Sequence, residues 1–288
     1  MTTLASAGYS QVETVAARDG TPLLTRRWPT AGDPWGTILV VHGLGEHSGR
    51  HDATGGRFAA AGLVATSYDH RGFGASGGRR AYVARWEALL DDLEDRLDAG
   101  RVDGLPSAIY GHSLGGLIAT DYLLSDRPRP DVAVLSAPAL SGGNAVLPAL
   151  AAVLARVWPT YAYANPWDIA KIVRDPRPPE VADLARDPLA VGRTTARLGH
   201  EMFKAMDRVR AGLEARGGYP LPTLVVHGGD DRLVPTASTA FLERFPATER
   251  RVYPGVRHLP HHDPLEGDRI VGEMIDWLRE RMAGIPTR

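Results

Sequence analysis

The sequence predicts a doubly wound α/β domain, in which helices cover both faces of a mostly parallel β-sheet. Three observations lead to this prediction. Short apolar runs rich in β-branched residues recur along the chain, as in strands that are buried on both faces. Segments with the periodicity of amphipathic helices separate most of these runs. The length of 288 residues and the apolar content of 43% are sufficient for one large core with an inserted subdomain.

The first segments of the chain predict an antiparallel hairpin. The segments "QVETVAA" (11–17) and "PLLTRRW" (22–28) flank Asp19-Gly20, a pair that is typical of tight turns. We therefore expect short antiparallel strands at the beginning of the sheet.

The remaining elements alternate between strand and helix. The apolar runs that predict buried strands are 37–43, 63–69, 107–113, 132–138 and 223–229, with a further short strand near 252. Helical periodicity occurs at about 53–61, 84–98, 114–125, 236–245 and 264–282. This alternation indicates parallel strands joined by helical crossovers.

One long stretch interrupts the alternation. Between about 140 and 219 we find no convincing strand, and helix-like pieces surround the proline-rich segment 174–190. An insertion of this size between two strands predicts a helical cap above the carboxyl ends of the strands. We therefore expect an α/β core formed by 1–139 and 220–288, with an inserted helical cap at 140–219.

The first part of the predicted cap is strongly apolar. One helical stripe holds Val146, Leu150, Val153 and Val157, and it is broadened by Leu147, Leu154 and Trp158. Such a helix packs against the main domain, faces a lipid surface or lines an acyl tunnel, and the sequence leaves these alternatives open. The apolar run at 145–155 is too short to cross a bilayer.

Composition excludes several classes of function. The 33 basic residues almost balance the 34 acidic ones, so nothing indicates nucleic acid as a partner. The absence of cysteine excludes disulfides, thiolate metal sites and a cysteine nucleophile. The first 15 residues contain neither a basic leader nor a long apolar core, so we expect a cytoplasmic protein. The apolar helix of the cap is the part that we expect to make any transient contact with a membrane surface. The sequence does not indicate an oligomeric state.

Ser113 lies in the pentapeptide Gly-His-Ser-Leu-Gly (111–115), between a predicted strand and a predicted helix. This is the G-x-S-x-G nucleophile elbow, a sharp turn whose glycines prevent collisions around a strained serine. The helix that begins at Leu114 directs free backbone N–H groups toward the position where an oxyanion would form. We therefore predict that Ser113 is a nucleophile.

A serine nucleophile needs a general base and an acid that orients the base. In folds that carry this elbow, the acid and then the histidine follow the serine along the chain. The segment "HGGDDRLVP" (227–235) follows one predicted strand, and "YPGVRHLPHHDP" (253–264) follows the next. We predict Asp231 as the acid and His258 as the base, with Asp230 as the alternative acid.

Seven segments together resemble the monoglyceride lipase and lysophospholipase group of the α/β-hydrolases. They are "HGLGEHSGR" (42–50), "DHRGFGASGG" (69–78), "GHSLGG" (111–116), "LSAPAL" (135–140), "RDPLA" (186–190), "HGGDDRLVP" (227–235) and "YPGVRHL" (253–259). The resemblance extends from about residue 11 to 282 and is most specific in the first segment. It implies the α/β-hydrolase fold.

The resemblance also implies roles for individual residues. These are Ser113 as nucleophile, Asp231 as acid, His258 as base, the backbone N–H groups of Leu44 and Leu114 as the oxyanion hole, and Glu46, Arg50 and His112 near the polar head of the substrate. The implied activity is cofactor-free hydrolysis of carboxylic esters of monoacylglycerols or lysophospholipids through an acyl-enzyme. Two alternatives remain: a general carboxylesterase or thioesterase acting on small acyl substrates, and a non-catalytic binding protein of the same fold.

Several histidines allow a metal site as an alternative interpretation. We expect His261 and His262 to be surface loop residues, and their spacing from His258 and Asp263 fits no helical ligand pair. A metal site is also conceivable at His42, His47 and His51, but the plainer interpretation is that His42 and Gly43 shape the oxyanion loop. We therefore expect no metal.

Two further patterns have competing interpretations. The segment "GFGASG" (72–77) fits the glycine pattern of dinucleotide-binding turns, but no clear helix begins within the glycines, so we interpret it as a loop near the active site. Glu46 and Arg50 form a local salt bridge or contact substrate, and the sequence leaves both alternatives open.

Overall fold

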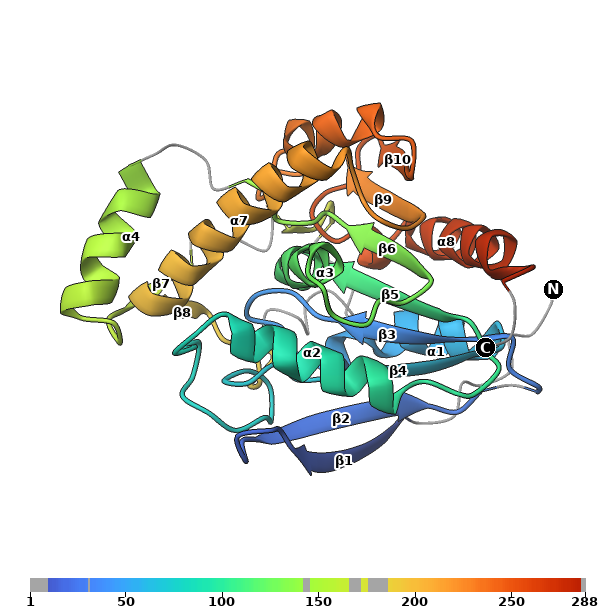
Figure 1. Ribbon diagram of the computed structural model, residues 1–288, viewed down its shortest axis with the longest axis horizontal. Helices are drawn as coiled ribbons and strands as arrows, with labels where there is room; N and C mark the ends of the chain where they lie inside the picture. Colours follow the sequence, from blue (N-terminus) through green and yellow to red (C-terminus); the bar gives the residue numbers. More distant parts are fainter. Residues whose placement is uncertain (1–9, 31, 142–145, 166–171, 176–185, 286–288) are drawn as a thin grey trace.

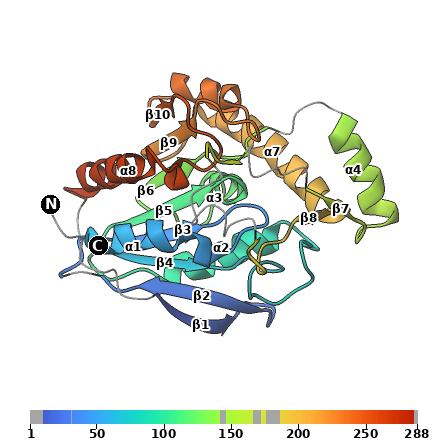
Figure 2. The same cartoon turned by 180° about the vertical axis from the view of Figure 1, so that it is seen from behind.

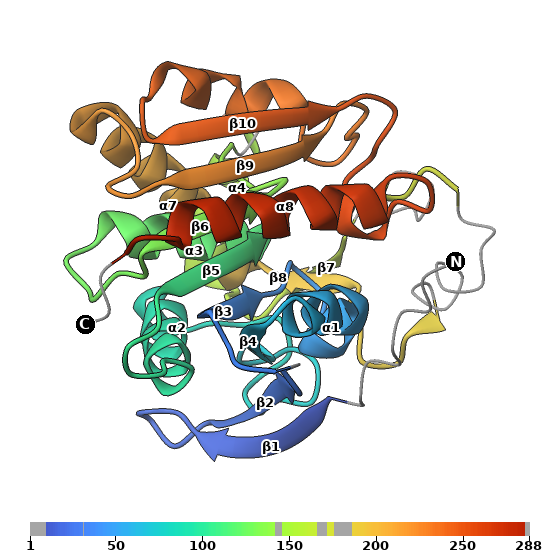
Figure 3. The same ribbon diagram turned by 90° about the vertical axis from the view of Figure 1, so that its right-hand side faces the viewer.

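The computed structural model describes residues 10–30, 32–141, 146–165, 172–175 and 186–285 (Figure 1). The strands of its main sheet are β1 (Gln11–Ala16), β2 (Pro22–Trp28), β3 (Gly36–Val41), β4 (Leu63–Tyr68), β5 (Ser107–His112), β6 (Val132–Ser136), β9 (Thr223–Gly228) and β10 (Thr248–Tyr253). This eight-stranded sheet has the order β1-β2-β4-β3-β5-β6-β9-β10. Figure 3 shows the strands stacked in this order, from β1 at the bottom to β10 at the top.

The directions of the strands confirm the predicted mixture of pairings. β1 pairs with β2 and β2 pairs with β4 in antiparallel fashion, whereas all pairs from β4 to β10 are parallel. The predicted turn lies between β1 and β2, where Gly20 has a positive φ of 81° and donates its N–H to the Ala17 carbonyl. All residues of β3, β5, β6 and β9 are buried, as expected for strands covered on both faces.

Helices cover both faces of the sheet. They are α1 (Asp52–Ala60), α2 (Glu87–Ala99), α3 (Leu114–Leu124), α4 (Val146–Val157), α7 (Ala196–Arg216) and α8 (Gly267–Met282), with 3₁₀ helices η1 (Ser48–His51), η2 (Thr236–Arg244) and η3 (Pro260–His262). Leu39 and Val41 of β3 belong to one core with α2, α3 and α7, and Ile38 and Val40 belong to a second core with α1 and α8. Successive residues of one strand thus supply the cores on opposite faces.

The segment 236–245 was predicted as an α-helix and is instead the 3₁₀ helix η2. Hydroxyl groups account for the difference. Thr236 donates its hydroxyl to the Gly228 carbonyl, and the Thr239 hydroxyl lies 3.1 Å from the Thr236 carbonyl. The first bond ties the start of η2 to β9, and the Thr239 hydroxyl competes for a main-chain acceptor of the first turn.

The expectation that 140–219 contains no strand is wrong. β7 (Ala162–Ala164) and β8 (Arg193–Thr195) form a small antiparallel sheet. Strands of three residues are too short to produce a recognisable periodicity, so the sequence did not reveal them. The remaining described helices of this stretch, α4 and α7, agree with a helical insertion, while the division into core and cap remains a prediction.

Helix α4 packs against α7 at the edge of the molecule, far from the main sheet (Figures 1 and 2). Ala151 and Ala155 form its buried side, whereas Leu150, Val153 and Val157 are 54%, 60% and 77% exposed. Packing of these three residues against the main domain, one of the expected alternatives, is therefore wrong. No helix within the described ranges combines the length and apolarity that a membrane span needs.

Candidate active site

Ser113 lies at the sharp turn between β5 and α3, with φ of 50° and ψ of −111°. A positive φ is strained for a residue with a side chain, so the surrounding structure must impose it. A Cβ atom on Gly111 would lie 2.7 Å from the Gly115 carbonyl oxygen, and one on Gly115 would collide with the Val41 carbonyl. The two glycines are therefore steric requirements of this turn.

Main-chain hydrogen bonds hold Ser113 in this conformation. Its N–H donates to the Ser136 carbonyl at 3.0 Å, and its carbonyl accepts from the N–H groups of Leu117 and Ala139, both at 3.1 Å. Ser113 is only 8% exposed. The backbone of Ser113 is thus held in place, and its side chain has little access to solvent.

The structure brings Ser113, Asp231 and His258 together. Nε2 of His258 lies 3.0 Å from Oγ of Ser113, and Nδ1 of His258 lies 2.8 Å from Oδ2 of Asp231. Because an ionised carboxylate only accepts hydrogen bonds, Nδ1 carries a proton, and the Nε2 lone pair accepts from the hydroxyl. A serine in this arrangement can transfer its proton as it attacks an electrophile.

The Asp231 carboxylate accepts four hydrogen bonds. Oδ1 accepts from the backbone N–H groups of Leu233 and Val234, and Oδ2 accepts from His258 and from Nε2 of His227 at 3.2 Å. Burial raises the pKa of Asp231, but the hydrogen bonds from His227 and His258 outweigh it and hold the pKa well below its usual range. Asp231 is therefore ionised at neutral pH.

The alternative acid, Asp230, is exposed, and its backbone N–H donates to the Val256 carbonyl. This geometry favours Asp231 as the partner of His258. His227 is fully buried against the carboxylate, and no role was predicted for it from the sequence. The available signal was its place in a buried strand, four residues before Asp231.

Two backbone N–H groups close to Ser113 are available as donors. Leu114 is the first residue of α3, so its N–H has no carbonyl partner within the helix. Leu44 follows β3 and lines a cavity beside Ser113. Neither N–H has a hydrogen-bond acceptor among the described residues. Such donors are suited to a developing oxyanion.

His42 fixes the loop that carries Leu44. The backbone N–H of His70 donates to Nε2 of His42 at 2.9 Å, so Nδ1 carries the ring proton and donates it to the Gly43 carbonyl at 2.8 Å. Burial lowers the pKa of His42 to about 3, which keeps the ring neutral. These contacts agree with the expectation that His42 and Gly43 shape this loop.

Glu46 holds the same loop from its other end. Its Oε2 accepts from the Gly43 N–H at 2.8 Å and lies 3.4 Å from Nε2 of His51. Burial raises the pKa of Glu46, but the interactions with His112 and His51 outweigh it and hold the pKa well below its usual range. The expected alternative of a salt bridge between Glu46 and Arg50 is wrong, because no ion pair joins these two described residues.

A small cavity of about 30 Å³ lies directly beside Ser113. It is lined by Gly43, Leu44, Glu46, Arg50, His112, Ser113, Ile172, Leu233, His258 and Leu259. This set includes the three residues expected near a substrate head group: Glu46, Arg50 and His112. A cavity of this size holds about one water molecule, so a larger molecule requires the lining side chains to move.

The expectation that His261 is a surface residue is wrong. His261 is 5% exposed, its Nδ1 lies 3.0 Å from the Tyr110 hydroxyl, and its ring stacks on His51 at 4.9 Å between ring centroids. The contact with the Tyr110 hydroxyl allows this burial of the ring. His262 is half-buried, and its Nε2 lies 2.7 Å from the Arg50 carbonyl. Among the described residues, no group of three or more potential ligands has an arrangement suited to a metal ion.

The segment 72–77 is a loop that lies against the first segment of the site. A Cβ atom on Gly74 would lie 2.6 Å from Cβ of His47, and Asp69 accepts from the backbone N–H groups of both Ser48 and Ala75. The next described helix, α2, begins only at Glu87. This geometry agrees with a loop beside the site and differs from a dinucleotide-binding turn.

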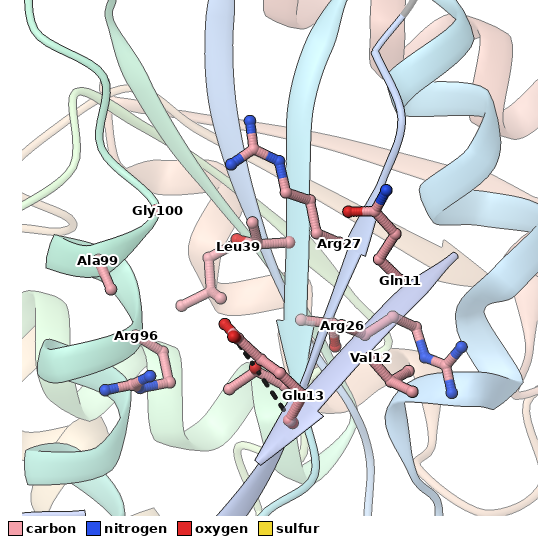
Figure 4. A pocket seen from close by; sticks show the side chains of 12 residues that line it. Gln11, Val12, Glu13, Arg26, Arg27, Leu39, Arg96, Ala99 and Gly100 are labelled. Atoms are coloured by element: carbon pink, nitrogen blue, oxygen red, sulfur yellow. Dashed lines mark hydrogen bonds between the residues drawn. The ribbon is translucent and has the colours of Figure 1, made fainter. Parts of the chain in front are cut away.

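A larger pocket, of about 380 Å³, lies between the β1–β2 hairpin and the end of α2. Figure 4 shows Glu13, Arg27 and Arg96 around it. The Thr25 hydroxyl donates to the Glu13 carboxylate here. The residues that line this pocket include no histidine, so it has no base that could activate a serine. Size alone therefore does not identify the functional site; the chemical groups beside Ser113 do.

Comparisons with known proteins point to one family. Residues 32–265 match the profile of the hydrolase family described as "Serine aminopeptidase, S33". The chain is 33% identical over 263 residues to the monoacylglycerol lipase of Mycolicibacterium smegmatis, covering 87% of this chain and 90% of that protein. It is 28% identical over 296 residues to human monoglyceride lipase, covering 97% and 94% of the two chains.

Solved structures agree with these relatives. The crystal structure of Paleococcus ferrophilus monoacylglycerol lipase is 27% identical, with a TM-score of 0.79 over 91% of this chain and 99% of that one. A soluble variant of monoglyceride lipase from Saccharomyces cerevisiae superposes with a TM-score of 0.85 over 96% of each chain, at 21% identity. At 21% identity, the similarity to the Saccharomyces cerevisiae structure supports a shared fold only.

Proposed function

Because the chain belongs to the serine aminopeptidase S33 family of hydrolases and has the α/β-hydrolase fold, we propose that it is a serine hydrolase of lipid-like carboxylic esters. The observation that carries this proposal is the line of hydrogen bonds from Ser113 through His258 to Asp231. The line ends in a cavity that also holds Leu44 and Arg50. Monoacylglycerols are the proposed substrates, in agreement with the names of the relatives.

In the proposed mechanism, His258 accepts the hydroxyl proton at Nε2 while Oγ of Ser113 attacks the ester carbonyl. The backbone N–H groups of Leu44 and Leu114 stabilise the negative charge on the tetrahedral intermediate. The C–O bond then breaks, and the glycerol oxygen leaves with the proton from His258. Water repeats these steps on the acyl-enzyme, which releases the fatty acid and restores the hydroxyl of Ser113.

The polar side of the cavity supports glycerol as the head group. Nδ1 of His112 lies 3.1 Å from the Ser136 carbonyl and therefore carries the ring proton, and burial lowers the pKa of His112 to about 3. Its Nε2 is thus an acceptor, 3.9 Å from Oε1 of the ionised Glu46. Nε2 of His112 and the Glu46 carboxylate are thus two acceptors that line one cavity. They can accept hydrogen bonds from the hydroxyl groups of glycerol but not from an ionised phosphate, which is itself an acceptor. We therefore favour monoacylglycerols over lysophospholipids.

The exposed apolar residues of α4 support a transient contact with lipid surfaces. Leu150, Val153 and Val157 lie at the edge of the molecule with more than half of their surface exposed. A substrate that is dissolved in micelles or bilayers has to be extracted from the lipid surface, and exposed apolar side chains can bind to that surface. We propose a cytoplasmic protein that meets its substrate in this way.

Covalent labelling tests the nucleophile. A fluorophosphonate probe should react with the wild-type protein and be retained on the peptide that contains Ser113, whereas Ser113→Ala should not react. Loss of the nucleophile should lower kcat by about a millionfold, because base and oxyanion donors then have no attacking group to assist. Near-normal ester hydrolysis by Ser113→Ala would refute the mechanism. Absence of both labelling and hydrolysis in the wild type would favour a binding protein.

A substrate series tests the lipid assignment. Monoacylglycerols, lysophospholipids, thioesters and simple esters of matched acyl length should be assayed side by side. Burial of two further methylenes should raise kcat/KM by about tenfold until the acyl site ends. Monoacylglycerols should exceed lysophospholipids of the same chain. A steady decline from acetyl esters upward would instead indicate an esterase or thioesterase for small substrates.

A further inference from the structure

One oxygen of the Asp231 carboxylate faces two histidines. Oδ2 lies 2.8 Å from Nδ1 of His258 and 3.2 Å from Nε2 of His227. His227 belongs to β9, has no exposed surface and does not contact Ser113. The proposed mechanism gives this second imidazole no role.

The hydrogen bonds around His227 define which nitrogen carries its proton. Nε2 of His227 faces two acceptors, the Val234 carbonyl at 2.9 Å and the Asp231 carboxylate, so Nε2 must be protonated. Nδ1 lies 3.0 Å from the Thr239 hydroxyl. In the Nε2–H tautomer, Nδ1 is an acceptor for this hydroxyl.

Arg250 orients that hydroxyl. Its Nε donates to Oγ1 of Thr239 at 3.1 Å, and its Nη2 donates to the Thr236 carbonyl at 2.8 Å. The Thr239 hydroxyl has one proton and two acceptors within reach, the Thr236 carbonyl at 3.1 Å and Nδ1 of His227 at 3.0 Å. Because Nη2 of Arg250 already donates to that carbonyl, donation of the hydroxyl to Nδ1 leaves neither acceptor without a partner. The side chain of Arg250 is 7% exposed, so solvent has little access to this arrangement.

We propose that His227 is a positioning residue that acts on Ser113 through Asp231 and His258. Held by Thr239 and Arg250, its Nε2–H group fixes Oδ2 at the point where that oxygen meets His258. The two backbone donors on Oδ1 fix the other end, so the carboxylate cannot rotate about its own axis. This inference rests on the proposed hydrolysis, but it concerns a separate property, the orientation of the Asp231 carboxylate.

Two substitutions at position 227 test the proposal. His227→Leu removes the donor and should lower kcat by about tenfold with KM within twofold, because orientation matters in the transition state more than in substrate binding. His227→Gln keeps an N–H donor at the place of Nε2 and should restore kcat to within about threefold of wild type. His200→Leu, on α7, is the matched control and should leave kcat unchanged.

A spectroscopic measurement separates positioning from folding. The proton shared by Nδ1 of His258 and Asp231 gives a low-field ¹H resonance, which should persist in the wild type and His227→Gln but broaden in His227→Leu. Thr239→Val is a milder variant, since it keeps the ring and removes only the hydroxyl that orients it. It should lower kcat by about threefold and broaden the same resonance.

The outcomes distinguish this inference from the proposed function. If the wild type hydrolyses esters and His227→Leu retains full kcat and an unchanged resonance, the positioning role is wrong while the function stands. Equal losses in the Leu and Gln variants would show a merely structural role and would also refute it. If the wild type hydrolyses nothing, the proposed function fails, and the resonance in the Leu and Gln variants still decides the role of His227.

Discussion

Two buried carboxylates lie near Ser113, and both are surrounded by histidines. Asp231 contacts His227 and His258, whereas Glu46 lies near His51 and His112. Both carboxyls have pKa values below their usual range despite burial. The two regions thus contain the same chemical groups in similar surroundings.

The difference lies in the second nitrogen of the intervening histidine. The Nε2 of His258 faces the Ser113 hydroxyl, so the charge of Asp231 supports proton transfer from the serine. The Nδ1 of His112 instead donates to the Ser136 carbonyl, which cannot give up a proton. A carboxylate and a histidine therefore form a catalytic unit only when the far nitrogen of the ring reaches a group that reacts.

The largest expected effect concerns the acid. Asp231→Asn should lower kcat by about 10⁴-fold, because an amide cannot stabilise the imidazolium and favours the wrong tautomer of His258. Asp230→Asn, on the exposed neighbour, is the matched control and should remain within about threefold of wild type. Steady-state hydrolysis of a monoacylglycerol measures both. A greater loss in Asp230→Asn would reverse the assignment of the acid and abolish the contrast with Glu46.

The next effect concerns the second carboxylate. Glu46→Ala should lower kcat/KM by about 10- to 100-fold, because Gly43 loses its acceptor and the N–H of Leu44 is held less firmly. This is a fraction of the roughly 3–4 kcal/mol typical for loss of a whole oxyanion donor. Glu13→Ala, in the pocket of Figure 4, should have no effect. A 10⁴-fold loss in Glu46→Ala would mean that the two carboxylates have equivalent roles.

Much of the fold could be predicted from short-range patterns in the sequence. The buried strands and the Asp19-Gly20 turn were predicted within a few residues, because apolar runs and turn pairs depend on short-range preferences. β7 and β8 were missed because pairing between three-residue strands depends on distant partners. The exposed side of α4 was also beyond prediction, since an apolar stripe does not reveal what it packs against.

The site shows the same limit. The partners of Ser113 were proposed from their order along the chain and from the resemblance to a family. The roles of His227 and His261 depend on contacts across the sheet, which no local pattern encodes. His261 joins a residue of β5, Tyr110, and His227 joins a threonine of η2. Of these two histidines, a surface position was predicted for His261 alone, and hydrogen bonds allow both rings to be buried.

Acid sensitivity should distinguish the two regions. Burial lowers the pKa of His42 and His112 to about 3 and of His262 to about 4, and all three lie on the Glu46 side. Unfolded histidines bind protons near pH 6.5, whereas these folded rings do not, so stability falls as the pH falls from about 6.5 toward 4. Each ring should contribute about 1.4 kcal/mol per pH unit, a tenfold change in the unfolding constant.

Urea unfolding between pH 7.5 and 4.5 measures this slope. His262→Gln removes one such group and should flatten the slope by about 1.4 kcal/mol per pH unit. Unchanged m-values would serve as the control for a single cooperative transition. A stability that is constant across this range, or that rises toward acid, would contradict the burial of neutral rings around Glu46.

The smallest expected effect concerns Arg50, which borders the Glu46 side of the cavity. Its Nε is buried without a hydrogen-bond partner among the described residues, so a substrate head group can supply one. Arg50→Ala should therefore raise KM for a monoacylglycerol by about 3- to 10-fold with kcat within twofold, as expected for one hydrogen bond that forms equally in ground and transition states. Arg57→Ala, on α1, removes an arginine that pairs with Asp268 and should leave KM unchanged. A fall in kcat at constant KM would place Arg50 with the reacting groups on the Asp231 side, and the two carboxylate regions would then no longer be separate.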